Sequence, residues 1–359
     1  MRVLISGGGT GGHLFPAIAV AQALSRKDPD VTVLFAGRRA GIEAKTIASY
    51  GMRFAAIPAA PLYTEQVWRN WNLPMVMGAA LWQSWRLIDR FKPDVVFGTG
   101  GYVSVPLITA AGLARLPVVL QEQNLMPGRA TRVLARFAKR VATAYPESSR
   151  YLRASTVLTG TPVRTEFWRR KENFPTQPRT MLVLGGSQGA HRVNRAVADA
   201  LPSLLERPDL AIAHQTGARE IDTMQAVKAT LPAPVAARYE PFAFANDLAD
   251  RIRAADLVVS RAGASTLSEV SALGIPMVLI PYPFAGGHQR LNATPYESAG
   301  AAVVIPDEEA DGGRLLGVVS SVIDDPVRYR KMVEAMRGLG RPYAAEEVAR
   351  LIEEVARHH

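Results

Sequence analysis

Short apolar runs alternate along the chain with segments whose apolar residues recur at helical spacing. In the first half, the runs predict strands at Arg2–Ser6, Val31–Ala36, Asp94–Gly98, Val118–Gln121 and Val141–Ala144, and helices at Phe15–Arg26 and around Gly41–Tyr50. In the second half, they predict strands at Thr180–Leu184, Leu210–His214, Asp256–Ser260 and Met277–Ile280, with helices from about His191 and within Arg261–Gly274. Strands that alternate with helices indicate a parallel sheet covered on both faces, and therefore an α/β fold.

The pattern restarts in the middle of the chain, which predicts two α/β units. Each unit opens with a strand, a glycine-rich loop and a helix: the loops are Gly7–Gly12 and Gly185–Ala190. The stretch Thr159–Pro178 is rich in proline, threonine and charge, so we place the boundary there. A last helix, Tyr343–Arg357, could belong to either unit. A length of 359 residues suits two domains with real cores.

Composition narrows the class of protein. The chain has no cysteine, which excludes disulfides and thiol nucleophiles and suggests a reducing compartment. No apolar run reaches the length of a membrane-spanning helix, and the start of the chain does not read as a signal peptide. The net charge of +10 indicates an anionic partner: nucleic acid, anionic lipid or a phosphorylated substrate. Solubility alone is the alternative explanation of this charge.

The two glycine loops predict phosphate binding. A tight turn from a strand into a helix leaves backbone amides exposed beside the positive end of the helix dipole. Gly7, Gly9 and Gly12 also satisfy a dinucleotide-binding spacing, and Arg38 at the end of the second strand could suit the 2′-phosphate of NADP. Neither loop is followed by a Walker A motif, so nucleoside triphosphate hydrolysis is not expected. The plainer alternative is close packing of strand on helix.

Several polar residues in the second half of the chain could together bind a nucleotide. Ser265 is a plausible helix cap, and the Glu269 carboxylate could accept bonds from ribose hydroxyls or support the helix N-terminus. Thr161–Arg164 reads as a helix start with proline at its first position, where Arg164 could reach a diphosphate. Gly287–Asn292 follows another strand at the binding end of its sheet.

Seven motifs together resemble the MurG family of glycosyltransferases. GGGTGGH, GTGGYVSVP, EQN, TGTPVR, GGSQGA, RAGASTLSE and HQRLNA occur in the order and spacing of that family, over nearly the whole chain. The resemblance implies a GT-B fold: Rossmann-like domains at 1–160 and 161–340 whose parallel sheets face each other across a deep cleft, and a helix at 341–359 that returns to the first domain. It implies transfer of N-acetylglucosamine from UDP-N-acetylglucosamine to lipid I, with inversion and without a cofactor, to give lipid II.

The resemblance also assigns binding residues. The donor would contact Thr10, Gly11, Gly12, Asn124, Arg164, Ser187, Gln188, Ala245, Ala264, Ser265, Thr266, Leu267, Ser268, Glu269, His288 and Gln289. The acceptor pyrophosphate and sugar would contact Gly9, Gly100, Gly101 and Tyr102. Uracil would be read by backbone groups near Phe244 and Ala245, in a loop more apolar than the family pattern. Gly287 also departs from that pattern.

Inverting transfer by single displacement needs a general base for the acceptor hydroxyl. His13 stands just past the first glycine loop, where a helix N-terminus favours the neutral imidazole, and Glu122 is the rival base. A histidine that caps its own helix and an inward-facing structural carboxylate are the plainer alternatives. The sequence Asp28-Pro29-Asp30 lies at the wrong end of the sheet for a metal site, so we interpret it as a turn.

Four of the five tryptophans lie within one short segment of the first half. Membrane contact is predicted for Trp68, Trp71, Met75, Trp82, Trp85, Arg86 and Arg90. Pro74 breaks the segment, so one helix is expected at about Met75–Phe91. A second basic run, Arg129 to Arg140, belongs to the same half. The alternative is that the tryptophans fill the core.

These features predict a peripheral protein on the cytoplasmic face of the plasma membrane. Its partners would be UDP-N-acetylglucosamine, lipid I, the anionic membrane surface and other proteins of cell-wall synthesis or division; no nucleic-acid-binding module is present. Three alternatives stay open: an NADP-dependent oxidoreductase, a membrane-docked scaffold that binds the nucleotide sugar, and an enzyme of 2-epimerase-like chemistry.

Overall fold

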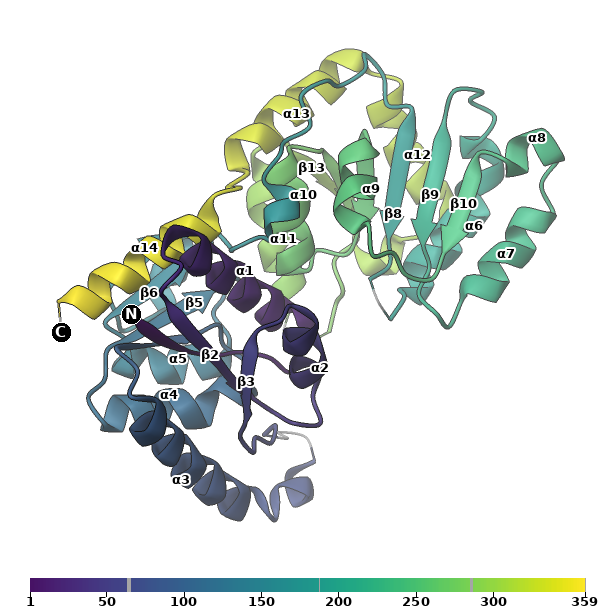
Figure 1. Ribbon diagram of the computed structural model, residues 1–359. Helices are drawn as coiled ribbons and strands as arrows, with labels where there is room; N and C mark the ends of the chain where they lie inside the picture. The colour runs from purple at the N-terminus through teal and green to yellow at the C-terminus, as the bar shows by residue number, and fades with distance from the viewer. Residues whose placement is uncertain (63–65, 187, 285–286, 359) are drawn as a thin grey trace. The chain divides into compact units, whose positions relative to one another are not determined.

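The computed structural model describes residues 1–62, 66–186, 188–284 and 287–358. The chain forms two compact units, Met1–Thr165 with Tyr343–His359, and Glu166–Pro342 (Figure 1). The transition between the units in the middle of the chain, at residues 165 and 166, falls inside the proline-rich stretch. Each unit is built around one parallel sheet.

The first unit contains a seven-stranded parallel sheet in the order β3-β2-β1-β4-β5-β6-β7. Its strands are β1 (Arg2–Ser6), β2 (Thr32–Gly37), β3 (Arg53–Ala56), β4 (Val95–Gly98), β5 (Val118–Glu122), β6 (Arg140–Thr143) and β7 (Thr156–Leu158). Its helices are α1 (Gly11–Lys27), α2 (Ile42–Ser49), α3 (Leu73–Phe91), α4 (Val105–Leu113), α5 (Arg129–Leu134) and α14 (Ala344–Arg357). Short 3-10 turns occur at η1 (Val67–Asn70), η2 (Tyr102–Ser104), η3 (Ala135–Phe137) and η4 (Pro146–Tyr151).

The central strands of this sheet are mainly apolar, with polar residues confined to their ends, because helices cover both faces. Strand β1 pairs in register with β2 through Val3 and Val33, and with β4 through Val3 and Val95. Val3, Leu4 and Ile5 are completely buried. Since all the strands are parallel, the loops that follow β1, β4 and β5 emerge at one edge of the sheet.

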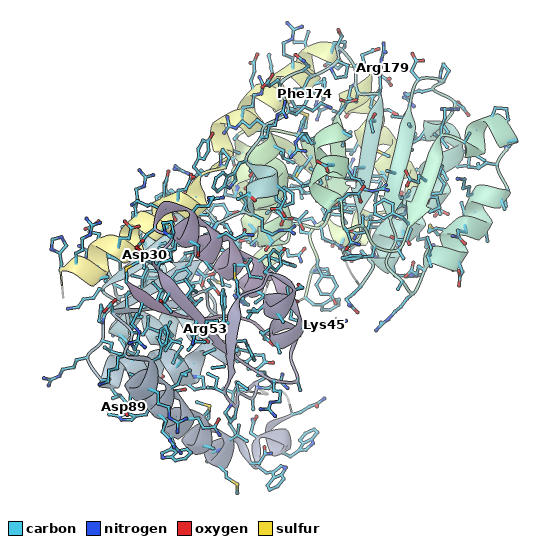
Figure 2. All side chains as sticks on the ribbon, viewed as in Figure 1. Asp30, Lys45, Arg53, Asp89, Phe174 and Arg179 are labelled. Carbon is cyan, nitrogen blue, oxygen red and sulfur yellow. The ribbon has the colours of Figure 1, made fainter. Side chains whose placement is uncertain are left out.

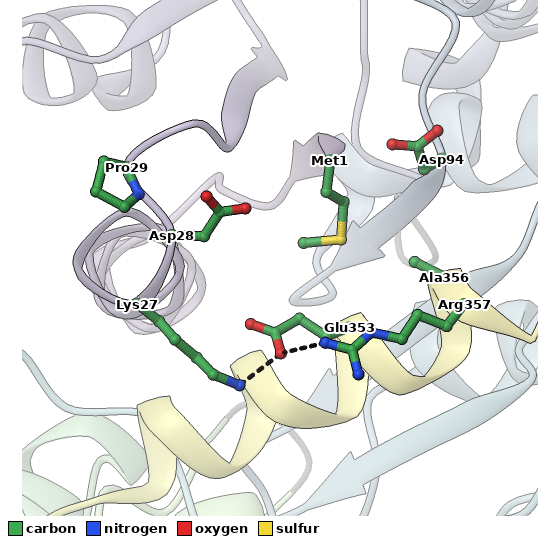
Figure 3. Close-up of a pocket in the computed structure, with 8 residues that line it drawn as sticks. All are labelled: Met1, Lys27, Asp28, Pro29, Asp94, Glu353, Ala356 and Arg357. Carbon is green, nitrogen blue, oxygen red and sulfur yellow. Dashed lines mark hydrogen bonds and ion pairs between the residues drawn. The ribbon is translucent and has the colours of Figure 1, made fainter.

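The last helix of the chain, α14, packs within the first unit rather than the second (Figure 1). Its apolar face, which includes Val348 and Ile352, is buried, and it lies along α1. Glu353 joins the two helices through an ion pair of 2.5 Å with Lys27 and also contacts Arg357 at 3.8 Å (Figure 3). The hydrophobic pattern alone left this helix unassigned, and only the family resemblance implied its return to the first domain.

Asp28-Pro29-Asp30 forms a turn beside this contact, as expected. Asp28 caps the C-terminus of α1, and its carboxylate accepts from the Asp30 amide at 3.0 Å. Asp28 lines the same pocket as Met1 and Asp94, at the end of the sheet opposite the glycine loop (Figures 2 and 3).

The second unit contains a six-stranded parallel sheet in the order β10-β9-β8-β11-β12-β13. Its strands are β8 (Thr180–Leu184), β9 (Ala211–Gln215), β10 (Tyr239–Phe242), β11 (Leu257–Ser260), β12 (Met277–Leu279) and β13 (Ala302–Val304). Its helices are α6 (His191–Leu204), α7 (Ile221–Ala229), α8 (Ala233–Ala236), α9 (Leu248–Ala254), α10 (Ala264–Leu273), α11 (His288–Ser298), α12 (Gly312–Ile323) and α13 (Pro326–Leu339). The 3-10 turns are η5 (Thr165–Phe167), which spans the transition between the units, and η6 (Asp307–Glu309).

Helix α3 carries the tryptophan segment on its exposed surface. It begins at Leu73, two residues before the expected start, because Pro74 stands in the first turn, where its missing amide costs no hydrogen bond. Ala80, Ser84 and Ile88 recur at helical spacing and are buried against the unit. Trp82 and Trp85 on this helix are 58% and 52% exposed, and Trp68 and Trp71 before it are 72% and 80% exposed. The alternative that the tryptophans fill the core is wrong.

Candidate functional site

Three neighbouring strands of the first unit place their loops together. The loops after β1, β4 and β5 carry His13, Gly100, Gly101 and Glu122, and the order of the strands makes the three loops adjacent. These residues are separated by up to 109 positions in sequence, so only the parallel topology brings them to one edge.

The first glycine loop is closed tightly by its neighbours. Gly9 has a φ of +85°, and a Cβ there would lie 2.8 Å from the ring of Tyr102. The Gly9 amide donates to Oε1 of the buried Glu43 at 2.5 Å. This amide is therefore engaged within the protein, while Thr10, Gly11 and Gly12 lead into the first turn of α1 with no side-chain cap.

His13 is held through one nitrogen of its ring. Nδ1 lies 2.8 Å from the carbonyl oxygen of Thr99 and 2.6 Å from the carboxamide of Gln123. A carbonyl can only accept, so Nδ1 carries the proton. The structure places the Gln123 amide nitrogen against Nδ1 and leaves its buried oxygen without a partner, and exchange of the two ends of this amide gives Nδ1 an acceptor there. Every polar contact of this ring with the described residues is made at Nδ1, which leaves Nε2 as the basic atom.

The electrostatic environment keeps this imidazole neutral. Burial lowers the pKa of His13 below its usual 6.5, and the Thr99 carbonyl and the Glu122 charge offset part of that effect. The ring lies against the backbone at Gly101, where a Cβ would come within 3.1 Å of it. A neutral ring with an unprotonated Nε2 has the form that a general base requires near pH 7.

Glu122, the rival base, accepts hydrogen bonds from the loop that follows it. One carboxylate oxygen accepts from the amide and the side chain of Asn124 at 2.9 and 3.0 Å, and the other accepts from the Gly128 amide at 3.0 Å. The side chain is 1% exposed. This geometry matches the structural alternative, in which Glu122 shapes the loop after β5 and orients Asn124.

Tyr102 links the first glycine loop to the second strand. Its hydroxyl accepts from Arg38 at 2.6 Å. Arg38 was the residue that suggested NADP, and this contact turns its guanidinium toward the loop after β4. Gly100 and Gly101 both adopt positive φ, which allows that loop to fold over His13.

The expected helix start at Thr161–Arg164 is wrong. These residues have no regular secondary structure, and only a short turn, η5, follows at Thr165–Phe167. The Arg164 guanidinium stacks on Phe15 of α1 with its central carbon 4.8 Å from the ring centroid. Packing on the neighbouring helix therefore decided the backbone here, against the local proline signal.

The second unit presents its own glycine loop between β8 and α6. Ser187 lies outside the described residues, and Gln188 is exposed. Gly189 rests directly on the loop after β9, since a Cβ on it would lie 2.5 Å from the carbonyl oxygen of Thr216. The two loops therefore hold each other in place.

A buried polar chain lies beneath these two loops. Tyr239 contacts Nδ1 of His214 at 2.9 Å, and Nε2 contacts the Asn194 carbonyl at 3.0 Å. The amide nitrogen of Asn194 donates to Thr216 O and to Glu220, both at 2.9 Å. Burial lowers the pKa of His214 to about 3, so the ring is neutral, with its proton on Nε2.

Helix α10 carries six of the sixteen expected donor residues, Ala264 to Glu269. Gly263, and not Ser265, occupies the N-cap, so the capping prediction is wrong. Ser265 and Thr266 stand in the first turn, and the Ser265 hydroxyl is buried without a partner among the described residues. Ser268 donates back to the Ala264 carbonyl at 2.8 Å.

Two residues of α10 are less accessible than a binding role suggests. The Leu267 side chain is completely buried, so only its backbone could face a ligand. Glu269 is 9% exposed and stands in the second turn of the helix.

Two further segments reach the same edge of the second sheet. Gln289 in the first turn of α11 accepts from the Tyr282 amide at 2.9 Å, while His288 opens the helix after Gly287. Phe244 in the loop after β10 is 65% exposed, and the adjacent Ala245 is half-buried. The predicted donor residues thus divide between the two units, with Thr10, Gly11, Gly12, Asn124 and Arg164 on the first.

Sequence reasoning missed several residues that support the site. Gln123 stands inside the EQN motif at the end of a predicted strand, so its position could have been inferred. Glu43, Asn194 and His214 lie on elements far along the chain from the loops that they hold, and nothing local in the sequence marks them.

Within the described ranges, no helix combines the length and apolar character needed to cross a bilayer. The exposed apolar and aromatic surface of the first unit is instead concentrated before and along α3. Arg86 on this helix stacks over Trp82 at 4.7 Å.

Comparison with known proteins agrees on one family. The glycosyltransferase family 28 N-terminal domain matches residues 3–143, and the family 28 C-terminal domain matches residues 180–355. A relative from Desulforudis audaxviator is 38% identical over 99% of both chains, and one from Moorella thermoacetica is 40% identical over 98% of both. Both are named UDP-N-acetylglucosamine–N-acetylmuramyl-(pentapeptide) pyrophosphoryl-undecaprenol N-acetylglucosamine transferase.

The fold comparison gives the same result. The crystal structure of Acinetobacter baumannii MurG matches with a TM-score of 0.79 at 28% identity, over 98% of this chain and 99% of that one. Two parallel-sheet α/β units, both family 28 domains and full-length similarity to named transferases support one assignment. The chain belongs to the MurG family of glycosyltransferases, within glycosyltransferase family 28, and has the GT-B class of fold.

Proposed function

We propose that this protein transfers N-acetylglucosamine from UDP-N-acetylglucosamine to the 4-hydroxyl of the MurNAc sugar in lipid I, which gives lipid II. The relatives that match along the full chain carry the name of this activity. The observation on this chain that carries the proposal is the geometry of His13, a neutral imidazole oriented through Nδ1.

The proposed reaction is a single displacement. The acceptor oxygen attacks the anomeric carbon of N-acetylglucosamine from the face opposite UDP, and the bond from that carbon to the diphosphate oxygen breaks. Nε2 of His13 takes the hydroxyl proton as the new bond forms. The Thr99 carbonyl and the Gln123 amide hold the ring from behind and stabilise the imidazolium that results.

UDP is assigned to the second unit. The N-termini of α6 and α10 would receive the diphosphate, aided by the dipoles of these two helices, because the Gly185 and Gly189 amides already donate to Gln215 and Gly186. Glu269 would accept bonds from the ribose hydroxyls, and the backbone near Ala245 would read uracil. We infer that amides and Arg164 supply the positive charge, so transfer needs no divalent cation.

The first unit is assigned to the acceptor and the membrane. Gly100 and Gly101 lie against His13, and together with Tyr102 they would contact the pyrophosphate and sugar. The Gly9 amide already donates to Glu43. Trp68, Trp71, Trp82 and Trp85 would enter the headgroup layer of the cytoplasmic leaflet, with Arg86 and Arg90 on anionic lipid. Attachment would be peripheral, and contact with other cell-wall or division proteins stays a prediction.

The test is turnover of UDP-N-acetylglucosamine with a lipid I analogue, with and without EDTA. We expect release of UDP together with a disaccharide product, unchanged by EDTA. His13→Gln should lose about 10²–10⁴-fold in kcat, which is the usual contribution of a general base. Oxidation of NADPH, release of a 2-epimer, or nucleotide-sugar binding without transfer would each assign the protein to one of the other classes.

A further inference from the structure

Residues of α3 and of β3, the edge strand of the first sheet, line a groove on the first unit. Figure 1 shows the two elements, and Figure 2 labels Arg53 on β3 and Asp89 on α3. Two adjoining cavities of about 370 and 360 Å³ form the groove, and both are lined by Ala56, Ile57 and Gln83. From Val76 to Arg90, α3 borders it over about 21 Å at 1.5 Å per residue. The groove is therefore elongated along α3.

The ends of the groove are cationic. Arg38 and Arg39 line the first cavity, Arg86 and Arg90 line the second, and neither lining contains an acidic residue. In the described part of the chain, no carboxylate forms an ion pair with these four arginines. Positive charge at both ends calls for an occupant with anionic groups.

The middle of the groove is apolar. Ala55, Ala56, Ile57 and Leu87 line the second cavity, and Pro58 and Ala59 extend the apolar lining of the first. Apolar side chains offer no hydrogen bonds or charge to a phosphate. A hydrocarbon chain that packs on them is removed from water, which lowers its free energy. The combination fits a lipid whose charged group lies at one end.

One end of the groove joins the predicted acceptor site. Arg38 donates to the Tyr102 hydroxyl at 2.6 Å, and the Tyr102 ring lies against Gly9 of the first glycine loop. The other end lies at Arg90, and Trp82, which is 58% exposed, lines the second cavity beside Gln83, midway along the stretch of α3 that borders the groove. The groove thus leads from the diphosphate end of the site to the tryptophan surface of α3.

We propose that this groove binds the polyprenyl chain of a lipid diphosphate, with Arg38 at the diphosphate end and Arg86 and Arg90 at the membrane end. The inference rests on the proposed function and deepens it, because it gives the lipid part of the acceptor its own binding site. The chain would pass from the bilayer along α3 to the loop that carries Tyr102, so recognition would extend beyond the sugar and the diphosphate.

Binding can be measured without turnover. Isothermal titration calorimetry compares a soluble prenyl diphosphate with inorganic diphosphate on the wild-type protein. We expect the prenyl compound to bind at least about tenfold more tightly, since burial of two CH₂ groups suffices for that ratio. Ala56→Phe fills the groove from an exposed position and should reduce the ratio to near one.

Ala79→Phe is the matched control. It adds the same ring to α3, at an exposed alanine that lines neither cavity, and should keep the wild-type ratio. Gln83→Trp blocks the groove from the other side if Ala56→Phe proves unstable. Transfer assays should show a raised KM for a long-chain acceptor in the groove variants, with the KM for a short-chain acceptor unchanged.

The outcomes separate the two proposals. If both groove variants keep the wild-type ratio, the groove does not bind the chain. If a short-chain phosphatidylglycerol displaces the prenyl diphosphate equally well, the groove is a phospholipid site and the inference is wrong. Absence of N-acetylglucosamine transfer by the wild-type protein would refute the proposed function, while the calorimetric comparison would still test the groove.

Discussion

His214 offers a test of how the second unit holds its glycine loop. Replacement by phenylalanine keeps a ring at a position that is completely buried but removes both ring nitrogens. The Tyr239 hydroxyl then loses its acceptor at 2.9 Å, and the Asn194 carbonyl loses its donor at 3.0 Å. Two polar groups are left buried without these partners.

The expected loss of stability follows from the number of buried polar groups left without a partner. A buried polar group without a partner costs about 1–3 kcal/mol, so two predict a loss of about 2–6 kcal/mol in the free energy of unfolding of this unit. Adding Tyr239→Phe removes one of the stranded groups and should recover about 1–3 kcal/mol relative to the single variant. If the double variant is more stable than His214→Phe alone, the lost hydrogen bond, and not the shape of the ring, causes the destabilisation.

Trp168 is the only tryptophan of the second unit and reports on its unfolding. Urea denaturation followed by tryptophan fluorescence, in a background where the four exposed tryptophans of the first unit are phenylalanine, gives the free energy. The KM for UDP-N-acetylglucosamine should rise in His214→Phe, because Asn194 anchors the Thr216 loop beneath Gly189. A destabilisation below about 1 kcal/mol would refute the argument.

The same residue predicts a pH dependence. The pKa of His214 is about 3 in the folded protein and 6.5 ordinarily. Between pH 3 and pH 6.5, this histidine is therefore protonated in the unfolded chain but neutral in the folded protein. Stability should therefore fall as pH drops from 6.5 toward 3, by about 1.4 kcal/mol per pH unit from this group. His214→Phe should lack that contribution, and equal slopes in the two proteins would contradict the assigned pKa.

Three further results are expected. The transfer rate should fall on the acid side of pH 6.5, where His13 becomes protonated, and the pH–rate profile of His13→Gln should lack this acid limb. Glu122→Gln should destabilise the loop after β5 by about 1–3 kcal/mol, measured by thermal unfolding, because an amide nitrogen then faces backbone donors, but its acid limb should remain. Trp71→Ala and Trp85→Ala should each weaken binding to anionic vesicles roughly tenfold in a sedimentation assay, with unchanged thermal stability, since both side chains are exposed.

Part of the candidate site could be predicted from local pattern. The glycine loops and His13 were placed correctly at strand-to-helix turns, because glycine next to an apolar run is a local signal. The proline at Pro162 and the serine at Ser265 gave equally local signals that were wrong. Arg164 packs on Phe15 of another element, whereas Gly263, only two residues before Ser265, takes the cap of α10.

The amino-acid sequence by itself determined the α/β class, the two-fold repetition of the pattern and nine of the thirteen strands. The four strands that it did not reveal, β3, β7, β10 and β13, are the edges of the two sheets. Strands β3, β7 and β10 are partly exposed and include polar or charged residues, so they lack the continuous apolar run that marks a central strand. Strand β13 does stand in an apolar run, Ala301–Ile305, and was missed all the same.

Only the tertiary structure decided which distant residues meet. It placed α14 on the first unit, Gln123 behind His13, Glu43 on the Gly9 amide and His214 beneath the second loop. Each of these contacts joins parts of the chain that no periodicity connects, because strand order, and not sequence order, sets which loops are neighbours.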